Sequence, residues 1–180
     1  MQKVHNNPIY LDAASTIPMH PEIINDSKVL MEQYYANADS LHYAGQRVSR
    51  LILESTEQLA KDLGVLSHEI FYTSGASESN SWAIQGVAFA NQNKGKHIIT
   101  SEIEHASILN TCKSLEENFG FEIEYLAVNE EGKVDPKTLE KALGSDTILV
   151  SLFAVNTELG SINDLSELAQ TIRKNSKAFF

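Results

Sequence analysis

The sequence has one cysteine, Cys112, among 180 residues, so no disulfide can form within the chain. A lone cysteine is consistent with a reducing compartment, and we expect a cytoplasmic protein. Positive charge is also scarce, because 14 Lys and Arg residues stand against 24 Asp and Glu, for a net charge of −10. This balance argues against binding to nucleic acid or to an anionic membrane surface, since both need clustered cations.

Long apolar runs are missing as well. No stretch approaches the roughly 20 apolar residues of a membrane-spanning helix. The polar segment 1–7 lacks the apolar core of a signal peptide. Hydrophobic residues make up 42% and charged residues 21% of the chain, which is typical of a globular protein with about one domain. No metal site is expected.

Short apolar segments alternate with helical patterns through the middle of the chain. The last of these segments is almost wholly apolar, as a strand buried on both faces should be. The alternation predicts an α/β fold with a mostly parallel sheet and helices on both faces. The predicted strands are Glu69–Ser74, His97–Ser101, Glu122–Val128 and Thr147–Val155.

Helix-end signals flank several of the helical patterns. Asp135 and Pro136 suit the N-cap and first position of a short helix that Gly144 can end. Asp164, followed three residues later by Glu167, resembles a capping box. Two further helical stretches precede the first predicted strand, namely Pro21 to Tyr35 and Val48 to Leu63, the second closed by Gly64.

Polar residues follow three of the predicted strands, at the ends where a parallel sheet binds its ligands. Gly75 follows the first strand and opens a helix, so the N–H groups of Ala76 and Ser77 would be free for an anion, best a phosphate. The alternative is a serine-rich turn in which Ser77 is merely the N-cap.

His105 and Asn156 follow the second and the most buried predicted strands. Taken alone, His105 is more typical of a surface histidine near a helix start. The carboxylates Glu102 and Glu104 before it could serve acid–base chemistry, but we expect them to be solvated. Asn156 must either find partners or face a ligand, and the alternative is an Asx-turn.

Five motifs, in order and with family-like spacing, together resemble the cysteine desulfurases. These are pyridoxal-phosphate (PLP) enzymes of the class V aminotransferase superfamily, with fold type I. The resemblance implies that residues 1–15 belong to the small-domain side and residues 16–180 form an incomplete PLP-binding large domain. The motifs are Tyr10-Leu11-Asp12, Ser40-Leu41-His42, Ser74-Gly75-Ala76-Ser77-Glu78, Ile103-Glu104-His105 and Val155-Asn156-Thr157-Glu158-Leu159-Gly160.

The resemblance implies roles for the matched residues. Ala76 and Ser77 match the pair that holds the PLP phosphate, and His105 matches the histidine stacked on the pyridine ring. Asn156 matches the asparagine near the ring hydroxyl and the substrate. Asn37 matches a further asparagine that we expect on the substrate side, in a loop where alanines replace the family's usual Gly and Pro.

The residues that perform the family's chemistry have no match in the sequence given. These are an aspartate on the pyridine nitrogen, the lysine that binds PLP covalently, and a cysteine that takes up sulfur. Lys174 and Lys177 lie at or beyond the polar end of the last helix and are expected to be solvated. Cys112 lies on the apolar stripe of its helix and is expected to be a buried structural thiol.

The resemblance implies a parent enzyme that converts L-cysteine to alanine and passes the sulfur to an enzyme thiol. A sulfur-acceptor protein would then use it for iron–sulfur cluster or thio-cofactor assembly, and the enzyme would be a homodimer. Residues 1–180 alone are expected to be inactive. Two alternatives stay open: another class V enzyme, such as a selenocysteine lyase or an aminotransferase, or a non-catalytic fragment or half of a split enzyme.

Overall fold

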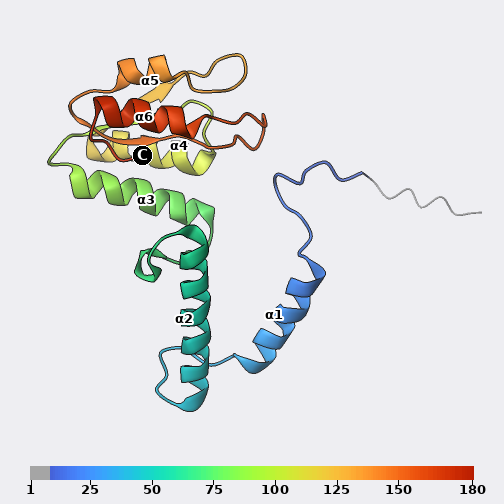
Figure 1. Ribbon diagram of the computed structural model, residues 1–180. Coiled ribbons are helices and arrows are strands. Elements are labelled where there is room, and N and C mark those ends of the chain that lie inside the picture. The colour runs from blue at the N-terminus through green and yellow to red at the C-terminus, as the bar shows by residue number, and fades with distance from the viewer. Residues whose placement is uncertain (1–8) are drawn as a thin grey trace, which may run out of the picture. The chain divides into compact units, whose positions relative to one another are not determined.

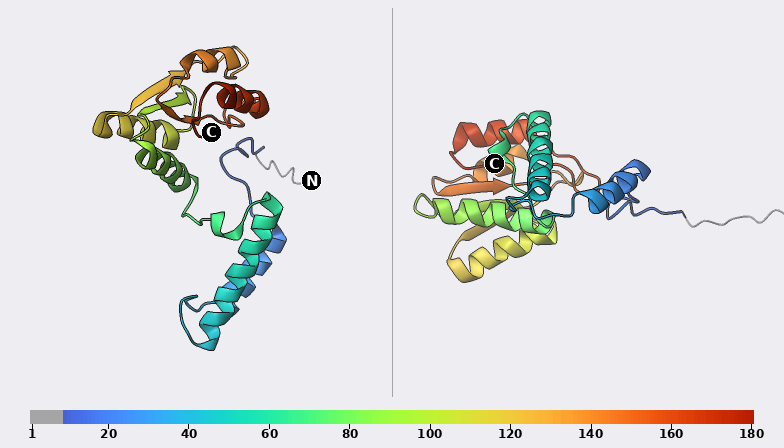
Figure 2. Two further views of the ribbon diagram at one scale, coloured as in Figure 1. Left: turned by 60° about the vertical axis from the view of Figure 1, so that its left-hand side comes forward. Right: turned by 90° about the horizontal axis from the view of Figure 1, so that it is seen from below.

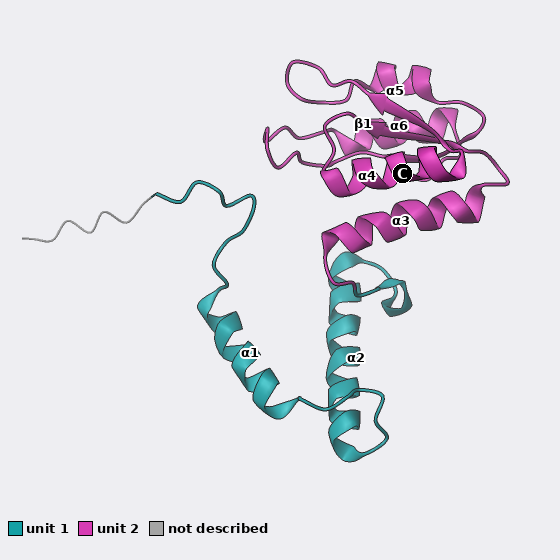
Figure 3. Cartoon of the chain, turned by 180° about the vertical axis from the view of Figure 1, so that it is seen from behind, with its two compact units in different colours: residues 1–72 teal, residues 73–180 magenta. Residues whose placement is uncertain are grey.

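The computed structural model describes residues 9–180, which divide into two compact units (Figure 3). One unit ends at Tyr72 and the other runs from Thr73 to Phe180. The polar start at residues 1–7 and most of the predicted segment 1–15 lie outside the described residues. The predicted boundary after residue 15 therefore stays a prediction.

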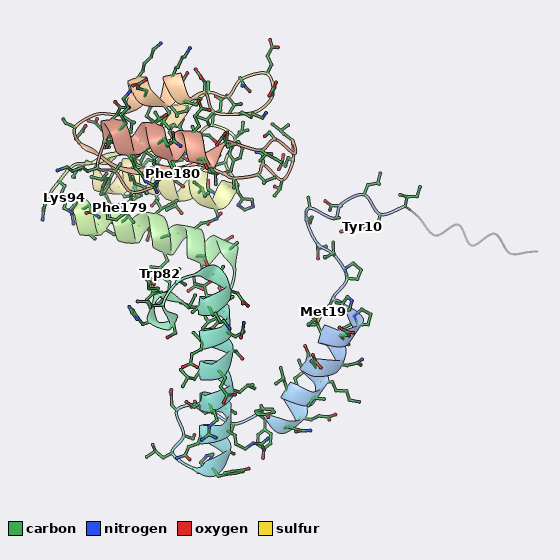
Figure 4. All side chains as sticks on the ribbon, viewed as in Figure 1. Tyr10, Met19, Trp82, Lys94, Phe179 and Phe180 are labelled. Atoms are coloured by element: carbon green, nitrogen blue, oxygen red, sulfur yellow. The ribbon has the colours of Figure 1, made fainter. Side chains whose placement is uncertain are left out.

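The first unit contains helices that bury little surface. Helix α1 spans Pro21–Gln33, helix α2 spans Tyr43–Leu63, and a short 3-10 helix, η1, spans Ser67–Glu69 (Figure 1). Gly64 ends α2 in the left-handed conformation, as its position predicts (φ 70°). Large apolar side chains are exposed here, including Met19 at 57% (Figure 4). No helix in residues 9–180 is long and apolar enough to cross a membrane.

Gly45 allows the loop before α2 to pack against the start of that helix. A Cβ atom at this position would lie 2.3 Å from the carbonyl oxygen of Ser40. The residue is buried, so only glycine leaves room for the loop there.

The second unit is built on a three-stranded parallel sheet. Strands β1 (His97–Ser101), β2 (Glu122–Leu126) and β3 (Thr147–Ser151) lie in the order β2-β1-β3. This confirms the predicted α/β class with a parallel sheet. Helix α3 precedes β1, and a helix follows each strand. The helices are α3 (Ala76–Asn91), α4 (Ala106–Phe119), α5 (Pro136–Ala142) and α6 (Leu165–Asn175).

Helices cover both faces of the sheet, as predicted (Figure 2, left). Ile98 lies in the core formed with α3 and α4, whereas Ile99 lies in the core formed with α5 and α6. Successive residues of a strand face opposite sides of the sheet, so β1 contributes fully buried side chains to both cores. Because the strands are parallel, their carboxyl ends lie at one edge of the sheet.

The predicted strand at Glu69–Ser74 is wrong. Glu69 belongs to η1, and residues 70–73 form no strand. A strand needs a neighbour for its N–H and C=O groups, and this segment pairs with none of the three strands β2, β1 and β3. On the outer side of β3, Phe179 bridges to the strand instead, donating to the Ile148 carbonyl at 3.0 Å.

Two other predicted strands are shorter than expected. The strand predicted at Glu122–Val128 ends at Leu126, and the strand predicted at Thr147–Val155 ends at Ser151. After β3, buried Asn163 binds the chain instead. Its N–H donates to the Ala154 carbonyl at 3.0 Å, and its Nδ2 donates to the Phe153 carbonyl at 2.9 Å. These bonds turn the segment away from the sheet.

Candidate functional site

The N-terminus of α3 is open to an anion. Its N-cap is Gly75, and no side chain caps this end within the described residues. The alternative with Ser77 as the N-cap is therefore wrong. The first hydrogen bond of the turn runs from the Ser79 N–H to the Gly75 carbonyl at 3.1 Å. The N–H groups of Ala76 and Ser77 thus stay available at a helix end whose dipole favours negative charge.

Other hydroxyl groups around the start of α3 form hydrogen bonds within the protein, but that of Ser77 forms none among the described residues. Glu78 accepts hydrogen bonds from the Ser74 hydroxyl at 2.7 Å and the Ser74 N–H at 2.6 Å, which hold the pKa of its carboxyl below the usual value. The hydroxyls of Thr73 and Ser79 lie 2.7 Å apart. Within the described residues no partner occupies the Ser77 hydroxyl, so it can serve an anion at the helix end.

His105 lies after β1 and is the N-cap of α4. Its Nδ1 accepts a hydrogen bond from the Ser107 N–H at 3.1 Å. In the neutral imidazole the proton therefore lies on Nε2. His105 is exposed, so it caps a helix, as an ordinary histidine near a helix start does, and remains accessible to solvent.

A groove of about 520 Å³ between α3 and α4 brings Ser77 and His105 together. Polar contacts join the two helices beside it. Nδ2 of Asn80 donates to the Ser107 hydroxyl at 2.9 Å. The groove thus places an open helix end and an imidazole side by side. Its other lining residues are Ser81, Gln85, Ala106, Ser107, Asn110, Thr111 and Ser114.

Asn156, after β3, uses both ends of its amide in contacts with the protein. Its Oδ1 accepts from the N–H groups of Glu158 at 3.0 Å and Leu159 at 2.9 Å, which is the Asx-turn given above as the alternative. Its Nδ2 donates to the Ile103 carbonyl at 3.0 Å. Asn156 does not line the groove, but it is bonded to the loop that carries His105.

Asn37 belongs to the unit that ends at Tyr72. Its Oδ1 accepts from the Asp39 N–H at 3.0 Å, and its carbonyl accepts from the Ser40 N–H at 3.1 Å. These bonds shape the loop before α2. The expected contact between Asn37 and a substrate stays a prediction.

The prediction that Glu104 is solvated is wrong. Its side chain is 7% exposed, and its Oε1 accepts from the Phe153 N–H at 2.7 Å and the Ser101 hydroxyl at 3.2 Å. Burial raises the pKa of this carboxyl, and the two hydrogen bonds oppose the rise. Glu102 is exposed, as expected. In the sequence, only the three-residue spacing between Ser101 and Glu104 indicates that Glu104 is bonded within the protein. Its stronger partner, Phe153, lies 49 residues away.

A larger cavity of about 730 Å³ opens at the opposite ends of the strands. Lys174 and Lys177 line it, and no predicted site residue does. We place the candidate site at the smaller groove, because it holds the open helix end and the imidazole. Cys112 is fully buried, and burial raises the pKa of its thiol to about 11, which confirms a structural thiol. In residues 9–180, no cluster of three potential ligands could hold a metal ion.

Known proteins resemble the chain along nearly its whole described length. The sequence model of the family described as aminotransferase class-V matches residues 9–180. The cysteine desulfurase IscS of Dictyoglomus turgidum is 45% identical over 166 residues, which cover 92% of this chain and 42% of that protein. The IscS of Methanosarcina thermophila is 39% identical over 174 residues, covering 97% and 43%. The chain spans less than half the length of these relatives.

Two solved structures match the fold. A NifS-like protein superposes with a TM-score of 0.89 at 34% identity, covering 93% of this chain and 46% of that one. SspA in complex with cysteine gives a TM-score of 0.84 at 33% identity, covering 92% and 47%. The chain thus has the fold of part of the NifS-like protein.

Proposed function

Because the chain belongs to the aminotransferase class-V family, we propose that it supplies phosphate and ring contacts of the PLP site in a cysteine desulfurase. One observation carries this proposal: Ser77, at an uncapped helix N-terminus, shares a groove with His105. A phosphate needs donors such as these N–H and hydroxyl groups. An aromatic ring needs a flat face such as the imidazole.

Each of these residues has a separate task in the proposed site. The N–H groups of Ala76 and Ser77, with the Ser77 hydroxyl, would hold the phosphate. His105 would cover one face of the pyridine ring and exclude water from it. Asn156 would keep the neighbouring loop in place near the ring hydroxyl. When bound, PLP supplies an electron sink for bonds broken in the substrate.

For the whole enzyme we propose conversion of L-cysteine to alanine, with transfer of the sulfur to an enzyme thiol and then to an acceptor protein. The names of the IscS relatives support this, as does the bound cysteine of SspA. A homodimer and a cytoplasmic location stay predictions. Selenocysteine cleavage and amino transfer stay alternatives that a comparison of the substrates would decide.

We propose that residues 1–180 alone do not catalyse this reaction. Among the described residues no lysine lines the groove, and the thiol of Cys112 is buried. Purified protein incubated with PLP and L-cysteine should therefore release no alanine. Alanine release above that of free PLP would contradict this expectation.

The test of the proposed site is a binding titration of residues 1–180. Deoxypyridoxine phosphate is the probe, because it lacks the aldehyde and cannot react with lysines. Binding is measured by isothermal titration calorimetry, because Trp82, on α3, does not line the groove and need not sense the probe. Deoxypyridoxine without the phosphate should bind at least about tenfold more weakly. Equal binding of the two compounds would overturn the proposal.

A matched pair of serine variants locates the phosphate. Ser77 and Ser166 each occupy the second position of a helix, but Asp164 caps the helix of Ser166 by accepting from the Glu167 N–H at 3.0 Å. Ser77→Ala should weaken probe binding about tenfold, the usual effect of one lost hydrogen bond to a charged group. Ser166→Ala should leave binding unchanged. Equal effects of the two variants would contradict the assignment.

A further inference from the structure

Glu104 is a buried carboxylate that joins the ends of two strands. The N–H of Phe153, two residues after β3, and the hydroxyl of Ser101, the last residue of β1, both donate to its Oε1. A buried charged group is costly unless hydrogen bonds compensate for lost water. The 2.7 Å bond to Phe153 is short, as charge-assisted bonds are. Glu104 therefore fixes the position of Phe153 relative to β1.

A second bond joins the same two loops in the opposite direction. Nδ2 of Asn156, in the loop after β3, donates to the Ile103 carbonyl, in the loop after β1, at 3.0 Å. Ile103 and Glu104 directly precede His105, and Phe153 lies three residues before Asn156. The two bonds thus close a ring of contacts that contains Asn156, and His105 directly follows this ring in the chain.

We propose that Glu104 is a positioning residue that sets the place of His105 relative to Asn156 and so aligns the imidazole with the cofactor ring. This inference rests on the proposed function for its second part, the effect on the cofactor. Its first part, the position of His105, stands on the contacts of Glu104 alone.

Three variants test whether Glu104 acts through its hydrogen-bond acceptor or through its charge. In Glu104→Gln the amide oxygen can still accept from Phe153 and Ser101, because both bonds end on Oε1. Glu104→Ala removes the acceptor. Glu102→Gln alters an exposed carboxylate in the same loop and is the matched control. If the Ala variant fails to fold, Glu104→Asp, whose shorter side chain draws the acceptor back from Phe153, replaces it.

The first experiment needs no cofactor. Amide hydrogen exchange at Phe153 and the imidazole NMR signals of His105 are recorded for residues 1–180 and each variant. Glu104→Ala should speed exchange at Phe153 about tenfold or more, as expected for loss of a protecting hydrogen bond, and should shift the His105 signals. Glu104→Gln and Glu102→Gln should change neither. Unchanged His105 signals in Glu104→Ala overturn the inference. In Glu104→Asp, used if that variant does not fold, unchanged His105 signals alongside faster Phe153 exchange overturn the inference.

The second experiment compares deoxypyridoxine phosphate with inorganic phosphate. If Glu104 positions the ring contact, Glu104→Ala should weaken binding of the ring compound about tenfold and leave inorganic phosphate unchanged. A general structural role would weaken both equally, which would overturn the inference. If the unaltered chain binds neither compound, the proposed function fails, and the NMR result still decides whether Glu104 positions His105.

Discussion

Asn156 and Ile103, 53 residues apart in the sequence, are joined by a hydrogen bond of 3.0 Å from the Asn156 amide to the Ile103 carbonyl. The same side chain closes an Asx-turn through its other atom, Oδ1. One asparagine therefore shapes its own loop and holds a neighbouring one. The two tasks use different atoms, so substitution can separate them.

Asn156→Asp should destabilise the chain although it preserves the turn. The carboxylate keeps the acceptor for Glu158 and Leu159 but places an oxygen against the Ile103 carbonyl in place of the donor. We expect the free energy of unfolding to fall by about 1–3 kcal/mol, measured by urea denaturation.

Asn129→Asp is the control for this variant. Asn129 is exposed, and its Oδ1 accepts from the N–H groups of Glu131 at 3.0 Å and Lys133 at 2.9 Å in a similar turn. It has no bond to a distant loop among the described contacts. Its substitution should change stability by less than about 0.5 kcal/mol. An equal loss at both positions would show that the bond to Ile103 contributes nothing.

Local signals in the sequence predicted the features that depend on neighbouring residues. Asp135 caps α5 by accepting from the Lys137 N–H, and Asp164 caps α6, as predicted. The motif resemblance is confirmed by the family match over residues 9–180. Helix ends and short motifs need only a few consecutive residues, which is why they could be read from the chain.

Features that depend on distant partners could not be predicted in this way. The segment 69–74 has strand-like composition, but no strand forms without a neighbour to pair with. The role of Glu104 depends on Phe153, and that of Asn163 on Val134, whose N–H donates to Asn163 Oδ1 at 2.9 Å. The sequence identifies these groups as polar but does not show that they are buried.

Glu104 should make the stability of the chain depend on pH. Burial raises the pKa of its carboxyl above the ordinary value of 4.5. The carboxyl is therefore easier to protonate in the folded chain than in the unfolded chain. The contribution of this group to stability is complete below the unfolded pKa and is lost as pH rises through the folded pKa. A difference of one between the folded and unfolded pKa values of a group corresponds to about 1.4 kcal/mol.

In Glu104→Gln the side chain stays uncharged, so the variant should not lose stability in this way as pH rises. Its free energy of unfolding relative to that of the unaltered chain should rise as pH increases from about 4.5 into the neutral range. Urea denaturation at a series of pH values measures the difference. With Glu102→Gln the difference should stay flat, because that side chain is exposed. A flat difference for Glu104→Gln as well would refute the assignment.

Cys112 should be inert toward thiol reagents while the chain is folded. It is fully buried, and burial, with smaller effects from Glu104 and Glu116, raises its pKa to about 11. Almost no thiolate is present near pH 8, and reagent cannot reach it. A disulfide reagent should report no free thiol in native protein and one per chain in denaturant. Rapid native reaction would contradict the buried position.

Thr147 joins three parts of the sheet at the amino ends of its strands. Its hydroxyl accepts from the Gly144 N–H at 2.8 Å and lies 2.8 Å from Nδ1 of His97. His97 in turn places Nε2 3.3 Å from the Glu124 carboxylate of β2. A series of contacts between side chains therefore runs across all three strands. It lies beside the register shift between His97 and Ile98 in the pairing of β1 with β3.

Thr147→Val should break this chain while keeping the shape of the side chain. Thr147 is 6% exposed, and the variant leaves the N–H of half-buried Gly144 without its acceptor. We expect a loss of about 1–3 kcal/mol in the free energy of unfolding, measured by urea denaturation. Thr157→Val, at an exposed position, should change it by less than about 0.5 kcal/mol. If the two variants lose the same stability, the hydroxyl of Thr147 is not what holds the strands in register.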